Sequence, residues 1–294
     1  MAVNFPAAAD SPALAEQWTL VIGPQDRWWK LPLREVWLYR DLLWIFIWRD
    51  FVTVYKQTIL GPVWFFLQPL LTTIMFTIIF SGVAKIPTDG LPPMLFYLAG
   101  FTPWNYFATS LTKTSATFVN NAQLFGKVYF PRLITPISIV ASNLIQFGIQ
   151  FLLFLIFLGY YLIRGTPLHP DWAMIPVLTP VLLLLLALLA MGAGILVSSL
   201  TTKYRDVTFL IAFGVQLAMY ATPVIYPLSH VPAKYRLLFE LNPMSAIIET
   251  FRAIYLGGTI PWMPLAGSAA VTLLLLLAGV ALFNRIEKTF TDTV

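Results

Sequence analysis

The sequence predicts an all-α integral membrane protein. We expect six transmembrane helices, an N-terminal amphipathic interfacial helix and two short re-entrant or interfacial helices before the last span. Hydrophobic residues make up 59% of the 294 positions and charged residues only 11%, which is more apolar surface than one soluble core can bury. The apolar residues also gather in six stretches of about 20 residues or more, the length that crosses a bilayer.

Residues 1–33 precede the first amphipathic segment. They contain no basic region followed by an apolar region, which argues against a cleaved signal peptide. We therefore expect a cytoplasmic tail.

Residues 34–61 are predicted to form the interfacial helix. Leu42, Ile45 and Phe46 recur at helical spacing on one side. Charged residues keep the other side in water: Arg40, Asp41, Arg49, Asp50 and Lys56. A helix of this kind lies along a membrane surface.

The six-span transmembrane domain is predicted over residues 62–287. Its spans are 62–83, 94–112, 133–163, 173–200, 207–227 and 261–283. Thirteen Lys and Arg fall on the side that holds the N-terminus and five on the other side. Because cytoplasmic loops carry the excess of basic residues, both termini are expected in the cytoplasm, with 288–294 as a short tail.

Charge and cysteine content exclude some function classes. The net charge of +5 is explained by this loop asymmetry, so no nucleic-acid partner is expected. The chain has no cysteine, which rules out disulfides and thiol chemistry.

Two patterns predict local structure within the domain. Residues 232–256 form two short helices broken at Asn242-Pro243, because a proline disfavours helical backbone in the residue before it. Ala190, Gly194 and Ser198 place small residues four apart, which predicts a close contact with another helix.

The energy source is expected on another polypeptide. The six predicted spans contain no Asp, Glu, Lys or His, which argues against proton or sodium coupling. Gly126-Lys127 is followed by Val128 and lacks the first glycine of a phosphate-binding P-loop. No cofactor is expected in this chain, and ATP and magnesium would bind to a partner subunit.

The order of several short motifs resembles one family. These are Arg49-Asp50-Phe51, Tyr55-Lys56-Gln57, Leu60-Gly61-Pro62, Trp64, Leu241-Asn242-Pro243 and Glu249-x-x-Arg252. The chain resembles, from Arg34 to Glu287, the permease subunits of ABC transporters that export polysaccharides in bacteria: O-antigen, capsule or teichoic acid. The resemblance implies a multi-pass protein of the bacterial inner membrane that forms a homodimer with two ATPase subunits. It also implies a lipid-linked polysaccharide substrate, with O-antigen as the first candidate, and no enzymatic activity of the permease alone.

Charged residues on the cytoplasmic side are candidates for coupling to the ATPase: Arg49, Asp50, Lys56, Lys127 and Arg132. The basic ones could equally be ordinary anchors at a membrane boundary. Asp50 requires another explanation, because acids contribute little to membrane orientation. We expect it either to contact a basic group of the ATPase or to orient a neighbouring arginine.

Polar amides and aromatic rings in the spans are candidates for the substrate path: Tyr97, Phe101, Trp104, Asn143, Gln146, Gln216 and Tyr220. Amides can bond sugar hydroxyls, and flat rings suit the apolar faces of sugars. Packing between helices explains such residues equally well.

In the resembled family, re-entrant helices shape the outer end of the channel, which makes the following residues candidates for an outer gate: Asn242, Pro243, Met244, Glu249 and Arg252. A structural lid without substrate contact is the alternative for this segment.

Two alternative functions remain open at this stage. One is an ABC permease that exports a small lipophilic drug or a lipid. The other is a membrane enzyme that uses His169 and Asp171 in a His-Pro-Asp turn as an acid/base pair, although no nucleophile or metal-ligand spacing accompanies them.

Overall fold

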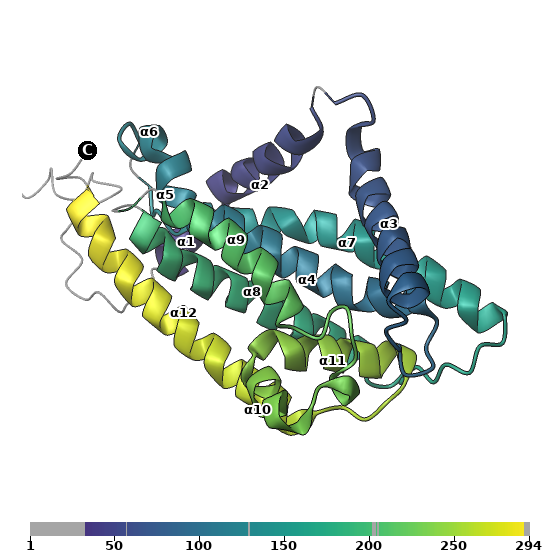
Figure 1. The fold of residues 1–294 in the computed structure, drawn as a ribbon. Coiled ribbons are helices and arrows are strands. Elements are labelled where there is room, and N and C mark those ends of the chain that lie inside the picture. Colours follow the sequence, from purple (N-terminus) through teal and green to yellow (C-terminus); the bar gives the residue numbers. More distant parts are fainter. Residues whose placement is uncertain (1–32, 57, 129, 202–203, 205, 291–294) are drawn as a thin grey trace, which may run out of the picture.

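The computed structural model describes residues 33–290 except 57, 129, 202–203 and 205, and every regular element among them is a helix (Figure 1). The α-helices are α1 Leu33–Leu38, α2 Arg40–Tyr55, α3 Trp64–Phe76, α4 Pro93–Ser115, α5 Thr117–Asn120, α6 Ala122–Phe125, α7 Ile134–Ile163, α8 Ile175–Thr201, α9 Val207–Tyr220, α10 Ala233–Leu241, α11 Pro243–Leu256 and α12 Trp262–Phe290. Short 3-10 helices cover Gly61–Val63 and Leu228–His230, and a π-helix, Thr77–Val83, continues α3. The predicted N-terminal tail lies outside the described residues except for Leu33.

Four helices in the described part of the chain are long and apolar enough to cross a membrane: Trp64–Val83, Ile134–Ile163, Ile175–Thr201 and Trp262–Arg285. These coincide with four of the six predicted spans. α9 is apolar but has only 14 residues, and α4 is long but carries more polar residues. The membrane class is therefore supported, whereas the number of six spans remains a prediction.

The helix predicted over 207–227 ends early, at Tyr220. Turns follow up to Pro227. Pro223 cannot donate a backbone hydrogen bond and disfavours helical backbone at Thr222, which explains the end of α9.

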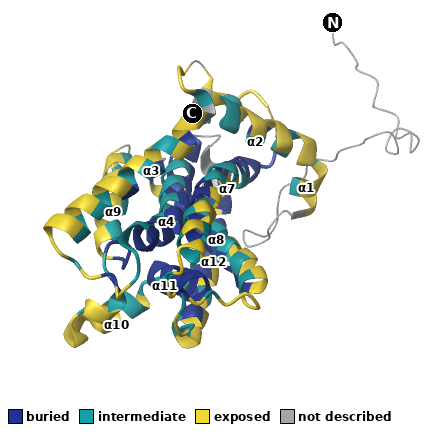
Figure 2. Ribbon diagram, turned by 90° about the vertical axis from the view of Figure 1, so that its right-hand side faces the viewer, coloured by how far each residue is buried: buried dark blue, intermediate teal, exposed yellow. Residues whose placement is uncertain are grey.

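α4 lies at the centre of the bundle, between α7, α8 and α11 (Figure 2). Its buried residues include Leu95, Leu98 and Ala99. The glycine of the small-residue series on α8 is in close contact with α4, because a Cβ on Gly194 would lie 2.6 Å from Cβ of Thr114. This confirms the predicted close helix contact. Gly192, also on α8, packs against the backbone of α12, because a Cβ there would lie 2.7 Å from the backbone nitrogen of Leu276.

The predicted interfacial helix over 34–61 is two helices, α1 and α2, with Tyr39 between them. α2 ends at Tyr55, and Gly61 adopts a φ of +52° before α3 begins. The predicted apolar side also divides: Phe46 packs edge to face on Phe130, with ring centres 5.7 Å apart, whereas Ile45 and Trp48 are exposed. The exposed tryptophans of α2, Trp44 and Trp48, are the residue type that prefers a membrane–water interface.

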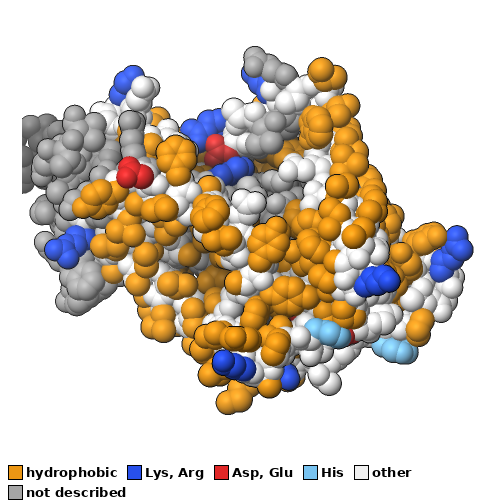
Figure 3. Space-filling model, in the orientation of Figure 1, with side chains coloured by type: hydrophobic (Ala, Val, Ile, Leu, Met, Phe, Trp, Pro, Cys, Tyr) orange, Lys and Arg blue, Asp and Glu red, His pale blue; other side chains and the backbone are white. Residues whose placement is uncertain are grey.

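α10 and α11 begin and end within one residue of the predicted short helices, and Asn242 separates them. The Asn242 side chain accepts a hydrogen bond from the Met244 amide (3.0 Å), and Pro243 occupies the first turn of α11, as favoured at helix N-termini. α11 is buried against α4, α8 and α12, so it does not lie on the surface of the bundle. The face of the molecule drawn in Figure 3 is largely hydrophobic, and most of the charged side chains on it lie near the edges.

Candidate functional site

A polar pocket of about 440 Å³ lies between α2, α4, α7 and the α5–α6 link. We call it the α2–α4–α7 pocket. Its lining residues are Arg49, Asp50, Thr53, Lys113, Asn120, Asn121, Ile139 and Ser142. Two of these were predicted for ATPase coupling. In Figure 3, basic and acidic side chains lie together at the upper edge of a mostly hydrophobic face.

Arg49 and Asp50, which both line this pocket, form an ion pair. Nε and Nη2 of Arg49 donate to Oδ1 of Asp50 at 2.9 and 2.7 Å. The guanidinium also lies over the Phe46 ring, 4.5 Å from its centre. Asp50 thus orients a neighbouring arginine, which is one of the two explanations expected for an acid at this position.

Lys113 joins α4 to α7 at the pocket wall. Its Nζ donates to Oδ1 of Asn143 (3.0 Å), and Nδ2 of Asn143 donates to Oγ of Ser110 (3.1 Å). Asn143 is buried. We did not predict these linked hydrogen bonds from the sequence. The serine one helical turn before the lysine on α4 is the only part of the pattern that the sequence shows.

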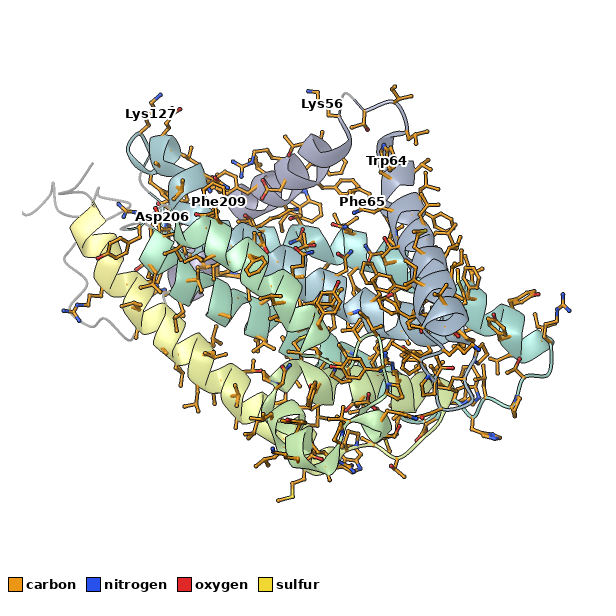
Figure 4. All side chains as sticks on the ribbon, in the orientation of Figure 1. Lys56, Trp64, Phe65, Lys127, Asp206 and Phe209 are labelled. Atoms are coloured by element: carbon orange, nitrogen blue, oxygen red, sulfur yellow. The ribbon has the colours of Figure 1, made fainter. Side chains whose placement is uncertain are left out.

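A narrower pocket adjoins the first and extends toward α3. It shares Asp50, Lys113 and Ser142 with the first pocket and adds Phe51, Phe65, Asn143 and Gln146. Phe51 and Phe65 close it with stacked rings whose centres are 5.9 Å apart. Phe65 points from α3 toward α2 in Figure 4. The structure therefore brings predicted coupling residues (Arg49, Asp50) together with predicted path residues (Asn143, Gln146).

The other predicted coupling residues lie outside this pocket. Lys56 follows the end of α2 and Lys127 lies beyond α6, both exposed at the same edge of the molecule (Figure 4). Arg132 lies with its guanidinium 5.6 Å from the centre of the Phe125 ring.

Tyr97 and Trp104 are not available to a passing polymer in this chain, which corrects one expectation. Their exposed fractions are 0% and 4%. Tyr97 contacts the rings of Phe76, Phe80 and Phe96, and the ring of Phe101 packs edge to face on Phe76. The long side chains point into the bundle because α4 is surrounded by other helices.

The two predicted path residues on α9 are accessible. Tyr220 is 50% exposed and Gln216 is also exposed. In contrast to α4, α9 has no buried residue. The predicted aromatic path is therefore divided between an interior set and an exposed set.

Two of the predicted outer-gate residues, Glu249 and Arg252, form a second polar site with the carbonyls of Pro223 and Val224 and the ring of Phe96; we call it the Arg252 cluster. Arg252 is buried and donates to the carbonyl oxygens of Pro223 (2.5 Å) and Val224 (2.7 Å) and to Glu249 (3.2 Å). Burial raises the pKa of the Glu249 carboxyl, and the neighbouring Arg252 guanidinium opposes this shift.

Asn242 also binds the segment that follows α9. Its Nδ2 donates to Oγ1 of Thr222 (2.9 Å) and to the carbonyl oxygen of Ala221 (3.3 Å). Met244 is buried, and the Pro243 carbonyl accepts a hydrogen bond from Ser268 of α12 (2.9 Å). The predicted gate residues thus connect the end of α9 to α4 and α12.

His169 and Asp171 are not arranged as an acid/base pair. Asp171 accepts hydrogen bonds from the amides of Ala173 (3.2 Å) and Met174 (3.1 Å), just before α8. Among the described residues, no ion pair joins it to His169, whose amide donates to the carbonyl of Leu256. Capping the entry to a helix explains Asp171 without catalysis.

Comparison with known proteins gives a consistent set of relatives. The family model of ABC-2 type transporters matches residues 41–256. An O-antigen export system permease protein, RfbA, of Klebsiella pneumoniae is 27% identical over 252 residues, which cover 86% of this chain and 94% of the relative. RfbA of Myxococcus xanthus is 29% identical over 265 residues (89% and 98%). The capsule polysaccharide export inner-membrane protein CtrC of Neisseria meningitidis serogroup A is 24% identical over 259 residues (82% and 89%). The region matched by the family model includes both polar sites.

Proposed function

Because this chain belongs to the ABC-2 type transporter family, we propose that it is the permease subunit of an exporter that moves a lipid-linked polysaccharide across the bacterial inner membrane. O-antigen is the first candidate cargo. ATP hydrolysis on a separate nucleotide-binding subunit would supply the energy, as the family implies.

One observation carries this proposal. The similarity to O-antigen and capsule export permeases extends over most of this chain, and the aligned region covers 89–98% of the length of each relative. A shared helical segment alone would not give such end-to-end coverage.

The contacts of α2 suggest how ATP hydrolysis would reach the membrane domain. α2 packs along α7, and the Lys113–Asn143 hydrogen bond joins α7 to α4. A push by the ATPase on α2 would therefore be transmitted to two long helices. Arg49 and Asp50 lie where this push would arrive, which supports their proposed role in coupling.

We expect two copies of the permease with two ATPase subunits. The centre of the single bundle is filled by α4 side chains such as Leu95 and Leu98, so a polysaccharide-wide path would have to lie between copies. The exposed Gln216 and Tyr220 of α9 are placed to contribute to it.

Reconstitution tests the proposed function. The permease would be co-expressed with a candidate ATPase from the same genome and incorporated into proteoliposomes with lipid-linked polysaccharide, and ATP-dependent exposure of polysaccharide to an added glycosidase would be measured. We expect exposure only with both subunits and hydrolysable ATP. Movement without ATP hydrolysis would exclude the proposal. Stimulation of ATP hydrolysis by small lipophilic compounds, with no movement of polysaccharide, would favour the drug or lipid exporter instead.

A further inference from the structure

We propose that the α2–α4–α7 pocket binds a phosphate group carried on a lipid, with Lys113 and Arg49 as its anion-binding residues. This inference rests on the proposed function insofar as the lipid is the carrier of the cargo. It adds a role for Lys113 and a chemical class of ligand for the pocket.

The charges of the pocket leave a positive excess. Among its described lining residues are two cations, Arg49 and Lys113, and one carboxylate, Asp50. Arg49 engages Oδ1 of Asp50 through one edge of its guanidinium. Arg49 and Lys113 therefore carry one more positive charge than Asp50 neutralises.

Unused donors point in the same direction. The Lys113 ammonium can donate three hydrogen bonds, and its only partner among the described residues is Asn143. Nη1 of Arg49 is free of Asp50. By contrast, the hydroxyls of Thr53 and Ser142 donate to carbonyls of their own helices. The open donors of the pocket thus include two cationic groups, the kind that binds phosphate oxygens most strongly.

The size and position of the pocket fit a lipid headgroup. Its volume of about 440 Å³ corresponds to roughly fifteen water molecules at about 30 Å³ each, which leaves room for a diphosphate. The exposed tryptophans of α2 place this helix at the membrane–water interface. The apolar rings of Phe51 and Phe65 stack beside this pocket, so a bound phosphate would lie next to apolar side chains.

The cation at the end of α4 also has a simpler explanation. Lys113 lies in the last turn of α4, where a positive charge offsets the helix dipole. That explanation requires only the charge near the helix end and predicts no effect of Lys113 on the binding of a lipid. Ligand binding therefore separates the two explanations.

Binding would be measured on the purified permease–ATPase complex without nucleotide, by native mass spectrometry and by titration. The probes are geranylgeranyl diphosphate, dioleoyl phosphatidic acid, uncharged geranylgeraniol and inorganic diphosphate. Lys113→Gln is the main variant, because its amide can still donate to Asn143. Lys113→Arg keeps the charge. Arg34→Gln is the matched control, since it removes one exposed cation of α1 on the same side of the chain.

We expect the two phosphate-bearing lipids to bind, geranylgeraniol to bind at least tenfold more weakly, and Lys113→Gln and Arg49→Gln to weaken lipid phosphate binding at least tenfold. Lys113→Arg and Arg34→Gln should remain within about threefold of the wild type. Stronger binding of the diphosphate lipid than of phosphatidic acid would assign the site to the cargo carrier. Equal binding would support a lipid phosphate site occupied by membrane phospholipid.

Two results would overturn the inference: unchanged lipid binding by Lys113→Gln at an unchanged melting temperature, or inorganic diphosphate binding as tightly as its lipid form. The proposed function is tested separately. If Lys113→Gln exports polysaccharide and binds lipids as the wild type does, this inference fails and the function stands. If lipid phosphate binding depends on Lys113 but no polysaccharide moves, the function fails and the site stands.

Discussion

The guanidinium of Arg252 lies 3.7 Å from the centre of the Phe96 ring, so a buried cation of α11 stacks on an aromatic residue of α4. One helical turn further along α4, Gly100 leaves room for the same guanidinium, because a Cβ there would lie 2.5 Å from Nη2 of Arg252. The two carbonyls that Arg252 binds belong to the segment after α9. This arrangement fixes three elements to one another through a single side chain.

Replacing Arg252 should therefore destabilise the contacts between α11, α4 and the segment after α9. Arg252→Leu leaves the carbonyls of Pro223 and Val224 without their donor, and each unsatisfied buried group costs about 1–3 kcal/mol. We expect a melting temperature several degrees lower in detergent, measured by intrinsic fluorescence. Arg236→Leu is the matched control, because Arg236 is exposed and pairs only with Glu240 among the described residues. Equal melting temperatures for Arg252→Leu and the wild type would contradict the structural role.

Gly100→Ala tests the same contact from α4. The added methyl group would meet Nη2 of Arg252 and the carbonyl oxygen of Val224, at 2.5 and 2.8 Å, so the cluster has to move. Overpacking of this kind typically costs about 1–3 kcal/mol. Gly148→Ala is the control on α7, since nothing lies within 4 Å of its Cβ position. We expect a lower melting temperature for Gly100→Ala only. A lower melting temperature for Gly148→Ala but not for Gly100→Ala would contradict the close contact between Gly100 and Arg252.

The contact of α8 with α12 depends on the absence of a side chain at Gly192. A Cβ there would lie 2.7 Å from the backbone nitrogen of Leu276, and backbone cannot move aside as a flexible side chain can. We expect Gly192→Ala to lower both the yield of folded protein and its melting temperature, whereas Gly267→Ala on α12, which faces open space, should change neither. Comparable stability of the two variants would argue against this helix contact.

Asp50→Ala should uncouple ATP hydrolysis from export while membrane insertion stays intact. Without the carboxylate, Arg49 loses the partner that orients it, and the α2–α4–α7 pocket gains a second uncompensated cation. The measurement is the ratio of polysaccharide moved to ATP hydrolysed in proteoliposomes. Asp41→Ala removes an exposed acid from the same helix and should leave the ratio unchanged. Wild-type export by Asp50→Ala at normal protein levels would refute the coupling role.

Alanine substitutions of aromatic residues distinguish rings that pack inside the bundle from rings that line the substrate path. Tyr97→Ala and Trp104→Ala remove buried rings, which typically costs about 3–5 kcal/mol, so export and stability should fall together. Tyr220→Ala should lower export while the melting temperature stays close to that of the wild type, because the hydrogen bond from Tyr226 is accepted by the backbone of Tyr220 and is kept. Tyr160→Ala provides a similarly exposed control on α7. If Tyr220→Ala exports normally, the path does not include this ring.

Local signals in the sequence determined most of the helices and many of their ends. Runs of apolar residues identify α3, α7, α8 and α12, because crossing a bilayer requires a length that composition alone reveals. The separation of α10 from α11 follows from Asn242-Pro243, since a cap and a proline act on the adjacent backbone. The early end of α9 was missed, although Pro223 provides its physical cause.

Which side chains meet was decided by the tertiary structure alone. Tyr97 and Tyr220 have the same chemistry, yet one is enclosed by α3 and α4 rings and the other lies on an exposed helix. Lys113 becomes part of a pocket only because Asn143, thirty residues away, and Arg49 of α2 approach it. Similarly, Arg252 contacts Val224, which lies 28 positions before it in the sequence, and Phe96, which lies 156 positions before it. Apolar periodicity shows that a helix has a buried side, but it does not specify the partner, because many helices of a membrane bundle present nearly equivalent apolar faces.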